Sequence, residues 1–98
     1  MQKWTNGDEY RGKYQKGKRN GQGTYILNNG ESYVGNWLNN YKHGYGVYIF
    51  IHGKYEGYWK YGKRHGTGIY TSNQGEIYDG YWQNDSKNGK GVSKNIIT

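Results

Sequence analysis

Histidines, carboxylates, hydroxyls and glycine pairs are the residues of this sequence that could do chemistry, and their spacing argues against a reaction. His43 and His65 occupy equivalent places in a repeated pattern, two strands or about 10 Å apart, whereas ligands of one zinc ion lie about 2 Å from the metal. No Gly-x-Gly pair extends to the G-x-G-x-x-G that opens a helix in a phosphate loop. No serine, histidine and acid come together as a triad. We therefore expect no catalytic, cofactor-binding or metal site, and no enzyme.

Binding chemistry is better represented, because cationic and aromatic side chains are abundant. The 98 residues carry a net charge of +7, and 18 of them are aromatic. Alanine is absent and glycine numbers 18, so helix propensity is poor, while Tyr, Trp, Ile, Val and Thr favour strands. Cysteine is absent as well, which removes disulfides as a source of stability. The composition predicts an all-β protein held together by aromatic packing.

An internal repeat indicates the elements that would position these side chains. A Tyr-x-Gly-x-aromatic motif returns at intervals of 23, 22 and 23 residues, as Tyr10, Gly12 and Tyr14, then Tyr33, Gly35 and Trp37, then Tyr55, Gly57 and Trp59, then Tyr78, Gly80 and Trp82. A second glycine pair follows each motif, at Gly21 and Gly23, Gly44 and Gly46, Gly66 and Gly68, and Gly89 and Gly91. We expect one array over residues 1–98, with repeats at about 10–32, 33–54, 55–77 and 78–98 after the end of a truncated repeat at 1–9.

The motif fits a strand, because residues two apart on a strand share one face. The tyrosines, tryptophans and glycines of each unit would then lie together. We expect a single-layer antiparallel meander of about eight strands built from four β-hairpins, an elongated twisted ribbon about 35 to 40 Å long. A three-residue loop at 28–30 and a tighter turn at 51–52 would absorb the shorter interval without reversing the aromatic face.

The register within each hairpin follows from a further assumption about the first loop. If Gln15 pairs with Gln22, then Tyr14 lies opposite Gly23, and each ring covers a glycine on the neighbouring strand. Such coverage rescues the packing that a strand glycine loses. The glycines would therefore be structural.

The pattern Y-x-G-x-W-x-x-G-x-x-x-G-x-G, best matched from Tyr55 to Gly68, resembles the membrane occupation and recognition nexus (MORN) repeat. The likeness runs from about Asn6 to Gly91. Four positions depart from the pattern, namely Tyr14 in place of Trp, Asn40 and Asp85 in place of Gly, and Ser93 in place of Tyr. The resemblance implies a scaffold at the cell cortex, cilia or other cytoskeletal structures, which binds partner proteins and sometimes dimerises.

The first loop of every unit falls on the same long edge of such a ribbon, and basic residues concentrate there. The candidate anion or lipid contacts are Lys16, Lys18, Arg19, Lys42, Lys63, Arg64 and Lys87. The opposite edge carries the carboxylates of Asp8, Glu9, Glu31 and Glu76. A basic row could attract acidic protein tails or anionic lipids, and nucleic acid is not the expected partner. Simple solubilising charge is the alternative.

Apolar residues gather on the face opposite the rings, at Ile26, Val34, Leu38, Val47, Ile49 and Ile69. Such a cluster is a candidate protein interface, and ordinary strand propensity at half-exposed sites is the alternative. The aromatic face offers a second groove, although its rings are needed as the core.

We expect a non-catalytic protein–protein interaction scaffold in the cytoplasm, at the cytoskeleton or cell cortex, whose partner presents a helical or acidic segment. No signal peptide follows Met1, and the longest apolar run, Val47 to Ile51, has five residues. The alternative is a membrane-binding module that recognises anionic phospholipids, including phosphoinositides, with the basic edge. Both ends look unfinished, so we also expect a longer array, self-association or end-to-end stacking.

Overall fold

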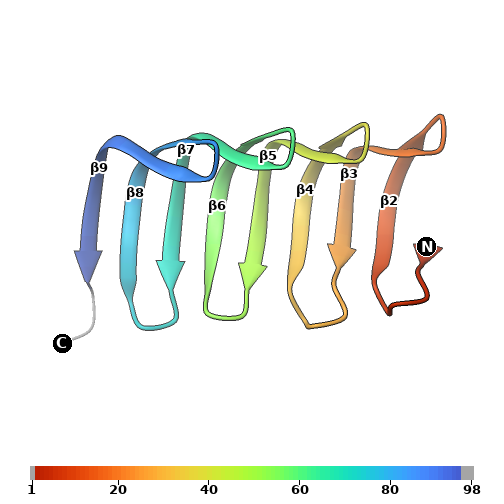
Figure 1. Ribbon diagram of the computed structural model, residues 1–98, viewed down its shortest axis with the longest axis horizontal. Coiled ribbons are helices and arrows are strands. Elements are labelled where there is room, and N and C mark those ends of the chain that lie inside the picture. The colour runs from red at the N-terminus through yellow and green to blue at the C-terminus, as the bar shows by residue number, and fades with distance from the viewer. Residues whose placement is uncertain (1, 96–98) are drawn as a thin grey trace.

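The computed structural model describes residues 2–95 as nine strands that join in chain order into one antiparallel sheet (Figure 1). The strands are β1 (Gln2–Lys3), β2 (Glu9–Gln15), β3 (Lys18–Ile26), β4 (Ser32–Leu38), β5 (Tyr41–Phe50), β6 (Gly53–Lys60), β7 (Lys63–Ser72), β8 (Glu76–Gln83) and β9 (Ser86–Asn95). Over these residues the chain forms no helix of the length and apolarity that crossing a membrane requires.

The predicted all-β meander of four hairpins is confirmed, with β2–β3, β4–β5, β6–β7 and β8–β9 as the hairpins. One strand was not predicted: β1, where Gln2 pairs with Tyr10. The sheet is a single layer with extents of 44 × 24 × 16 Å. Successive hairpins stack along the long axis, so each contacts mainly its neighbours.

The loops within the hairpins are two-residue turns at the top of Figure 1, called here the upper turns: 16–17, 39–40, 61–62 and 84–85. Both residues of each have positive φ, for example 52° at Lys16 and 76° at Gly17. Such turns match the right-handed twist of the strands they join. The predicted register is therefore wrong, because Gln15 pairs with Lys18 and Gly12 lies opposite Gly23.

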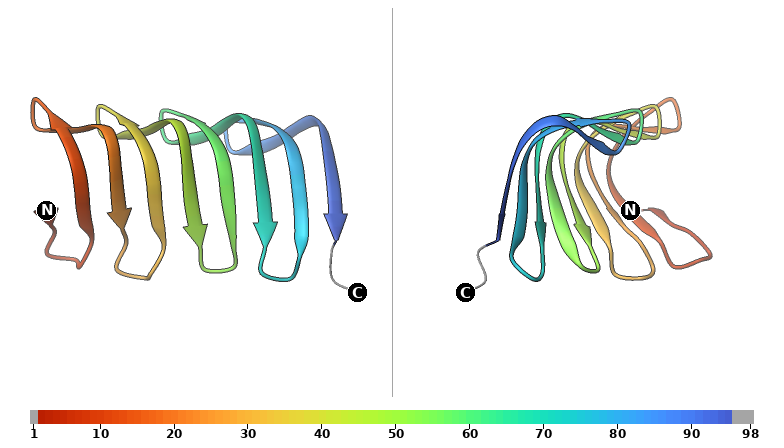
Figure 2. Two further views of the ribbon diagram at one scale, coloured as in Figure 1. Left: turned by 180° about the vertical axis from the view of Figure 1, so that it is seen from behind. Right: turned by 60° about the vertical axis from the view of Figure 1, so that its left-hand side comes forward.

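Every hairpin also contains a bulge, which the sequence pattern did not predict. The bulge takes up the residues that the longer predicted loop would have held. Gly35 pairs with Gly46 and Trp37 with Lys42, so residues 43–45 of β5 lie opposite Asn36 alone. The central bulge residue is Gly44 with φ of 91°, and Gly21, Gly66 and Gly89 repeat it. A bulge bends a strand. Figure 2 shows the result, in which the upper end of every hairpin bends sharply away from the line of the lower strands.

The lower turns, between hairpins, agree with prediction. Leu27 donates its N–H to the Glu31 carbonyl at 2.9 Å around the loop 28–30, and Gly30 has φ of 95°. Phe50 pairs with Gly53, which makes 51–52 a two-residue turn. The shorter second repeat thus keeps its rings on the common face.

The core is a row of rings on one face of the sheet. Its buried members are Tyr10, Tyr33, Trp37, Tyr48, Tyr55, Trp59, Tyr78 and Trp82. The Tyr10 ring lies over Gly23, where any added Cβ would collide with the Tyr10 hydroxyl, and that hydroxyl donates to the Lys13 carbonyl at 2.9 Å. The predicted covering of a glycine by a ring is present, but its ring is Tyr10 and not Tyr14.

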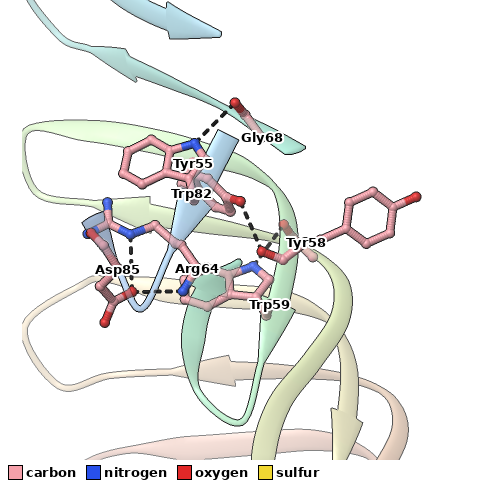
Figure 3. Close-up of polar contacts among 8 residues, drawn as sticks. Tyr55, Tyr58, Trp59, Arg64, Gly68, Trp82 and Asp85 are labelled. Carbon is pink, nitrogen blue, oxygen red and sulfur yellow. Dashed lines mark hydrogen bonds and ion pairs between the residues drawn. The ribbon is translucent and has the colours of Figure 1, made fainter. Parts of the chain in front are cut away.

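Three of the four tryptophans, namely Trp37, Trp59 and Trp82, each link one hairpin to the preceding one. Trp59 donates its indole N–H to the Gly46 carbonyl at 3.2 Å. Its ring packs edge-on against Tyr33 and Tyr55, with centroids 5.5 and 5.2 Å away. Trp82 repeats this arrangement with the Gly68 carbonyl one hairpin later (Figure 3). Edge-on aromatic pairs stabilise the fold by more than the area they bury would predict. The row of rings therefore connects successive hairpins into one continuous core.

Candidate functional site

The seven basic candidates fall into two sets. Lys16, Lys18 and Lys63 are exposed at or beside the upper turns. The other four lie on the aromatic face, which corrects their predicted place in an outer loop: Arg19, Lys42, Arg64 and Lys87. The two-residue turns cause the difference, because they pair these four directly with Tyr14, Trp37, Trp59 and Trp82. Directly paired residues share a face.

These four cations lie over the rings. The Lys42 ammonium is 5.0 Å from the Trp59 ring centroid, and the Lys87 ammonium is 4.9 Å from that of Tyr78. The guanidinium carbons of Arg19 and Arg64 lie 4.8 and 4.6 Å from the tryptophans of the following hairpins, Trp37 and Trp82. A cation over an aromatic face is stabilised by about 0.5 to 2 kcal/mol. The charges therefore line the upper side of the aromatic face.

Two residues that depart from the repeat pattern, Asn40 and Asp85, form hydrogen bonds with Arg19 and Arg64 respectively. Asp85 Oδ1 accepts hydrogen bonds from the Arg64 backbone N–H at 2.8 Å and from Arg64 Nε at 3.2 Å (Figure 3). Asn40 Oδ1 accepts from the Arg19 backbone N–H at 2.9 Å. In the hairpin between them the equivalent residue is Gly62, whose N–H donates to the Lys42 carbonyl at 2.8 Å.

Two of the carboxylates predicted on the opposite edge serve the lower turns. Asp8 accepts from the Tyr25 hydroxyl at 2.7 Å and from the Asn28 N–H at 2.8 Å. Glu31 accepts from the Tyr48 hydroxyl at 2.9 Å and from a backbone N–H at 3.1 Å. The tyrosine hydrogen bonds are the main cause that lowers the pKa of both Asp8 and Glu31. The Asp8 and Glu31 carboxylates therefore stabilise the lower turns through these hydrogen bonds.

Rings, cations and turns together line two open hollows on the aromatic face, and we call the two hollows the trough. The first, of about 270 Å³, is lined by Arg19, Tyr25, Leu27, Trp37, Lys42 and Tyr48, among others. The second, of about 490 Å³, includes Phe50, His52, Arg64, Tyr70, Trp82 and Lys87. Upper-turn residues line both, so the bent upper ends of the hairpins form one wall.

The predicted apolar interface lies on the outer face, opposite the trough. Val34, Ile49 and Ile69 are exposed, and Ile26, Leu38 and Val47 are half-buried. Val34 pairs with Val47, but Glu56 separates Val47 from Ile69, and Leu38 lies at an upper turn. The structure thus brings together only part of this set.

Exposed tyrosines on the outer face are a feature that sequence reasoning missed. Tyr45, Tyr58 and Tyr81 are each about half exposed, and Tyr45 pairs with Tyr58. They lie within or opposite the bulges, so predicting them required the correct register.

Within residues 2–95, no three His, Asp or Glu side chains cluster as a metal site would need.

Comparison with known proteins identifies the repeat. A family model described as MORN repeat matches residues 10–32, 33–54, 55–77 and 78–94. No curated protein matches the chain. The four matched segments begin at Tyr10, Tyr33, Tyr55 and Tyr78, the tyrosines that cover the strand glycines.

Proposed function

We propose, from the premise that this chain belongs to the MORN repeat family, that it is a non-catalytic scaffold that holds a segment of a partner protein in the trough. The family is generally non-enzymatic, and its repeats are consistent with an interaction or membrane-associated module. A place at the cytoskeleton or cell cortex, in the cytoplasm, is part of the proposal and rests on the family alone.

The observation that supports a partner in the trough is the kind of residue that lines it. Tryptophan, tyrosine and arginine dominate the energetics of protein interfaces, and the trough offers Trp37, Trp82 and both arginines beside two hollows. Cation and ring contacts fix these side chains before any partner arrives. Binding to a preorganised surface loses less conformational entropy.

The dimensions of the array suit an elongated segment. The sheet is 44 Å long, and a helix of about 20 residues measures roughly 30 Å. A helical segment lying along the trough could therefore contact both hollows. Its apolar side chains would pack on Leu27 and Phe50, which line the first and second hollow respectively.

Recognition of anionic phospholipids is the second candidate, and the exposed part of the upper edge supports it. Lys16, Lys18 and Lys63 are exposed there, and Tyr41 and Tyr61 are more than half exposed beside them. Basic and aromatic side chains together favour a membrane interface. Four of the seven basic candidates face rings instead, which leaves fewer charges for such a surface.

A pull-down from cell extract, run beside flotation with phosphoinositide vesicles at low and physiological salt, separates these functions. The trough variant carries Tyr70→Ser and Lys87→Glu, and the outer control carries Val34→Thr and Ile69→Thr. Thermal melts check that both variants are folded. We expect the trough variant to lose a partner protein that the outer control retains.

Two results would contradict the proposal. Loss of the partner only from the outer control would make the outer face the interface. Vesicle binding at physiological salt, without a protein partner, would instead support the lipid function. A variant with Lys16→Glu, Lys18→Glu and Lys63→Glu should then lose the vesicles.

A further inference from the structure

The two arginines of the trough occupy equivalent places but differ in how well they are satisfied. Arg64 Nε donates to the Asp85 carboxylate at 3.2 Å. Asn40 occupies for Arg19 the place that Asp85 occupies for Arg64, and the backbone carbonyls of both residues accept from the arginine Nη2, at 3.1 and 2.9 Å respectively. Arg19 Nε is buried and, within residues 2–95, meets no acceptor. Arg19, which lines the first hollow, therefore carries a positive charge with one unsatisfied donor and no carboxylate hydrogen-bonded to it among residues 2–95.

Lys42 adds a second cation to the same hollow. Gly62 provides no side chain to hold it, and within the described part of the chain the Lys42 ammonium forms no ion pair or hydrogen bond. It contacts the rings of Tyr48 and Trp59 at 5.2 and 5.0 Å. Burial lowers the pKa of Lys42, the charge of Asp85 acts in the opposite direction, and the charge of Arg19 lowers it further. The two cations destabilise each other's charge.

Among the residues that the structure describes, none that lines this hollow is acidic. The hydroxyls of Tyr25 and Tyr48, which also line it, already donate to Asp8 and Glu31. A buried charge without a partner is costly, so an anion that entered the hollow would gain two charge-assisted contacts. The second hollow differs, because Asp85 and Glu31 both line it.

We propose that the first hollow binds a carboxylate of an acidic segment of the partner, held between Arg19 and Lys42 over the rings of Trp37 and Tyr48. This inference rests on the proposed function, and it names the partner's chemistry. The precedent lies in the molecule itself, since Asp85 supplies Arg64 with the group that Arg19 lacks. Asn40 Oδ1 already accepts from the Arg19 backbone N–H, so an aspartate or glutamate of the partner adds the negative charge that the neutral Asn40 does not provide.

A random library of twelve-residue peptides, selected on the wild-type protein, tests this chemistry. We expect the selected peptides to contain an aspartate or glutamate. Replacing that residue in the peptide by asparagine or glutamine should weaken binding about 10- to 100-fold, as expected for a hydrogen-bonded charge pair.

The variant Asn40→Asp provides the sharper test, because it supplies the carboxylate from within the chain. Asn40 has φ of 72° and Asp85 has φ of 69° in the equivalent place, so the backbone accepts aspartate there. We expect the selected peptides to bind Asn40→Asp at least about tenfold more weakly. The control is Lys63→Gln, which lowers the net charge by the same amount on the outside of the sheet and should leave the affinity within about twofold.

The outcomes distinguish the inference from the function on which it rests. Peptides that respond to Tyr70→Ser with Lys87→Glu, but show no acidic preference or bind Asn40→Asp as well as the wild type, would overturn the carboxylate site and leave the trough as the interface. Failure to select any peptide, or selection of peptides that only the outer control disturbs, would overturn both.

Discussion

The inner and outer faces of this sheet are built from alternate residues of the same strands, yet they differ in how strictly the repeat is kept. Apart from Tyr14 and Ser93, inner positions carry the same tyrosines, tryptophans and glycines in successive hairpins, with the same hydrogen bonds at Trp37, Trp59 and Trp82. Outer positions change freely, as at Val34, Glu56 and Asp79. Single-layer packing explains this, since only one face has neighbours to satisfy.

The comparison also bears on the proposed function. Inner positions that depart from the pattern are informative, because the repeat would otherwise hold them constant. The second residue of the upper turn is an example, because it differs between hairpins as Asn40, Gly62 and Asp85. These three residues give different environments to Arg19, Lys42 and Arg64 respectively. The proposed carboxylate site depends on that variation, whereas the rings beneath it are common to successive hairpins.

The largest contrast between the faces is expected for adjacent residues of β6. Trp59→Ala removes a ring that is buried between two tyrosines, and should lower the free energy of unfolding by about 3 to 5 kcal/mol. Tyr58→Ala on the outer face, which is half exposed, should cost less than about 1 kcal/mol. Urea unfolding monitored by circular dichroism measures both, and equal costs would refute the division of the sheet into a core face and a solvent face.

The next effect concerns glycine. In Gly46→Ala the new methyl group collides with the Tyr33 hydroxyl, and we expect a loss of about 1 to 3 kcal/mol. The control is Gly17→Asn at an upper turn, where Asn40 already adopts the same left-handed backbone. That substitution should change the midpoint of denaturant unfolding very little. A destabilised Gly17→Asn beside a neutral Gly46→Ala would contradict the role of ring coverage.

A smaller effect is expected at the lower turns. The hydrogen bond from the Tyr48 hydroxyl lowers the pKa of Glu31 in the folded protein. This hydrogen bond therefore stabilises the fold above the unfolded-state pKa of the carboxyl, and the gain is lost as pH falls through the folded-state pKa. Because Glu31 is only partly buried, the effect should be below about 1 kcal/mol. Thermal melts between pH 3 and 7 should show a flatter profile for Glu31→Gln and Tyr48→Phe, and profiles that parallel the wild type would exclude this contribution.

The smallest effect is expected for the apolar cluster of the outer face. Val34 is 50% exposed, so Val34→Thr should alter the unfolding free energy by no more than about 0.5 kcal/mol. Differential scanning calorimetry on the isolated chain measures this change. A larger loss would mean that a second layer covers the outer face, for example another copy of the chain.

The sequence was sufficient for the repeat, the meander and the lower turns, because four copies of one pattern make the strand period unambiguous. The interval of 22 residues even located the shorter turn at 51–52, since a strand deletion would have reversed the face. The buried rings also followed, because a single layer with this composition has no other core.

The register and the trough could not be predicted, and the reason is the bulge. From the sequence, Gly21 and Gly23 look alike, but Gly21 has φ of 85° in the bulge while Gly23 lies under the Tyr10 ring. A longer loop without a bulge fits the same spacing. That alternative places Arg19 and Lys42 in an outer loop, whereas the bulged hairpin directs both onto the rings.

The most direct test of the trough as the binding surface is a nuclear magnetic resonance titration of the chain with a selected peptide. The account predicts that the Arg19 Nε–H signal and the Trp37 and Trp82 indole signals shift on binding, while the backbone amides of Val34 and Ile69 remain in place. Shifts confined to the outer-face amides, with the arginine and indole signals unchanged, would contradict it.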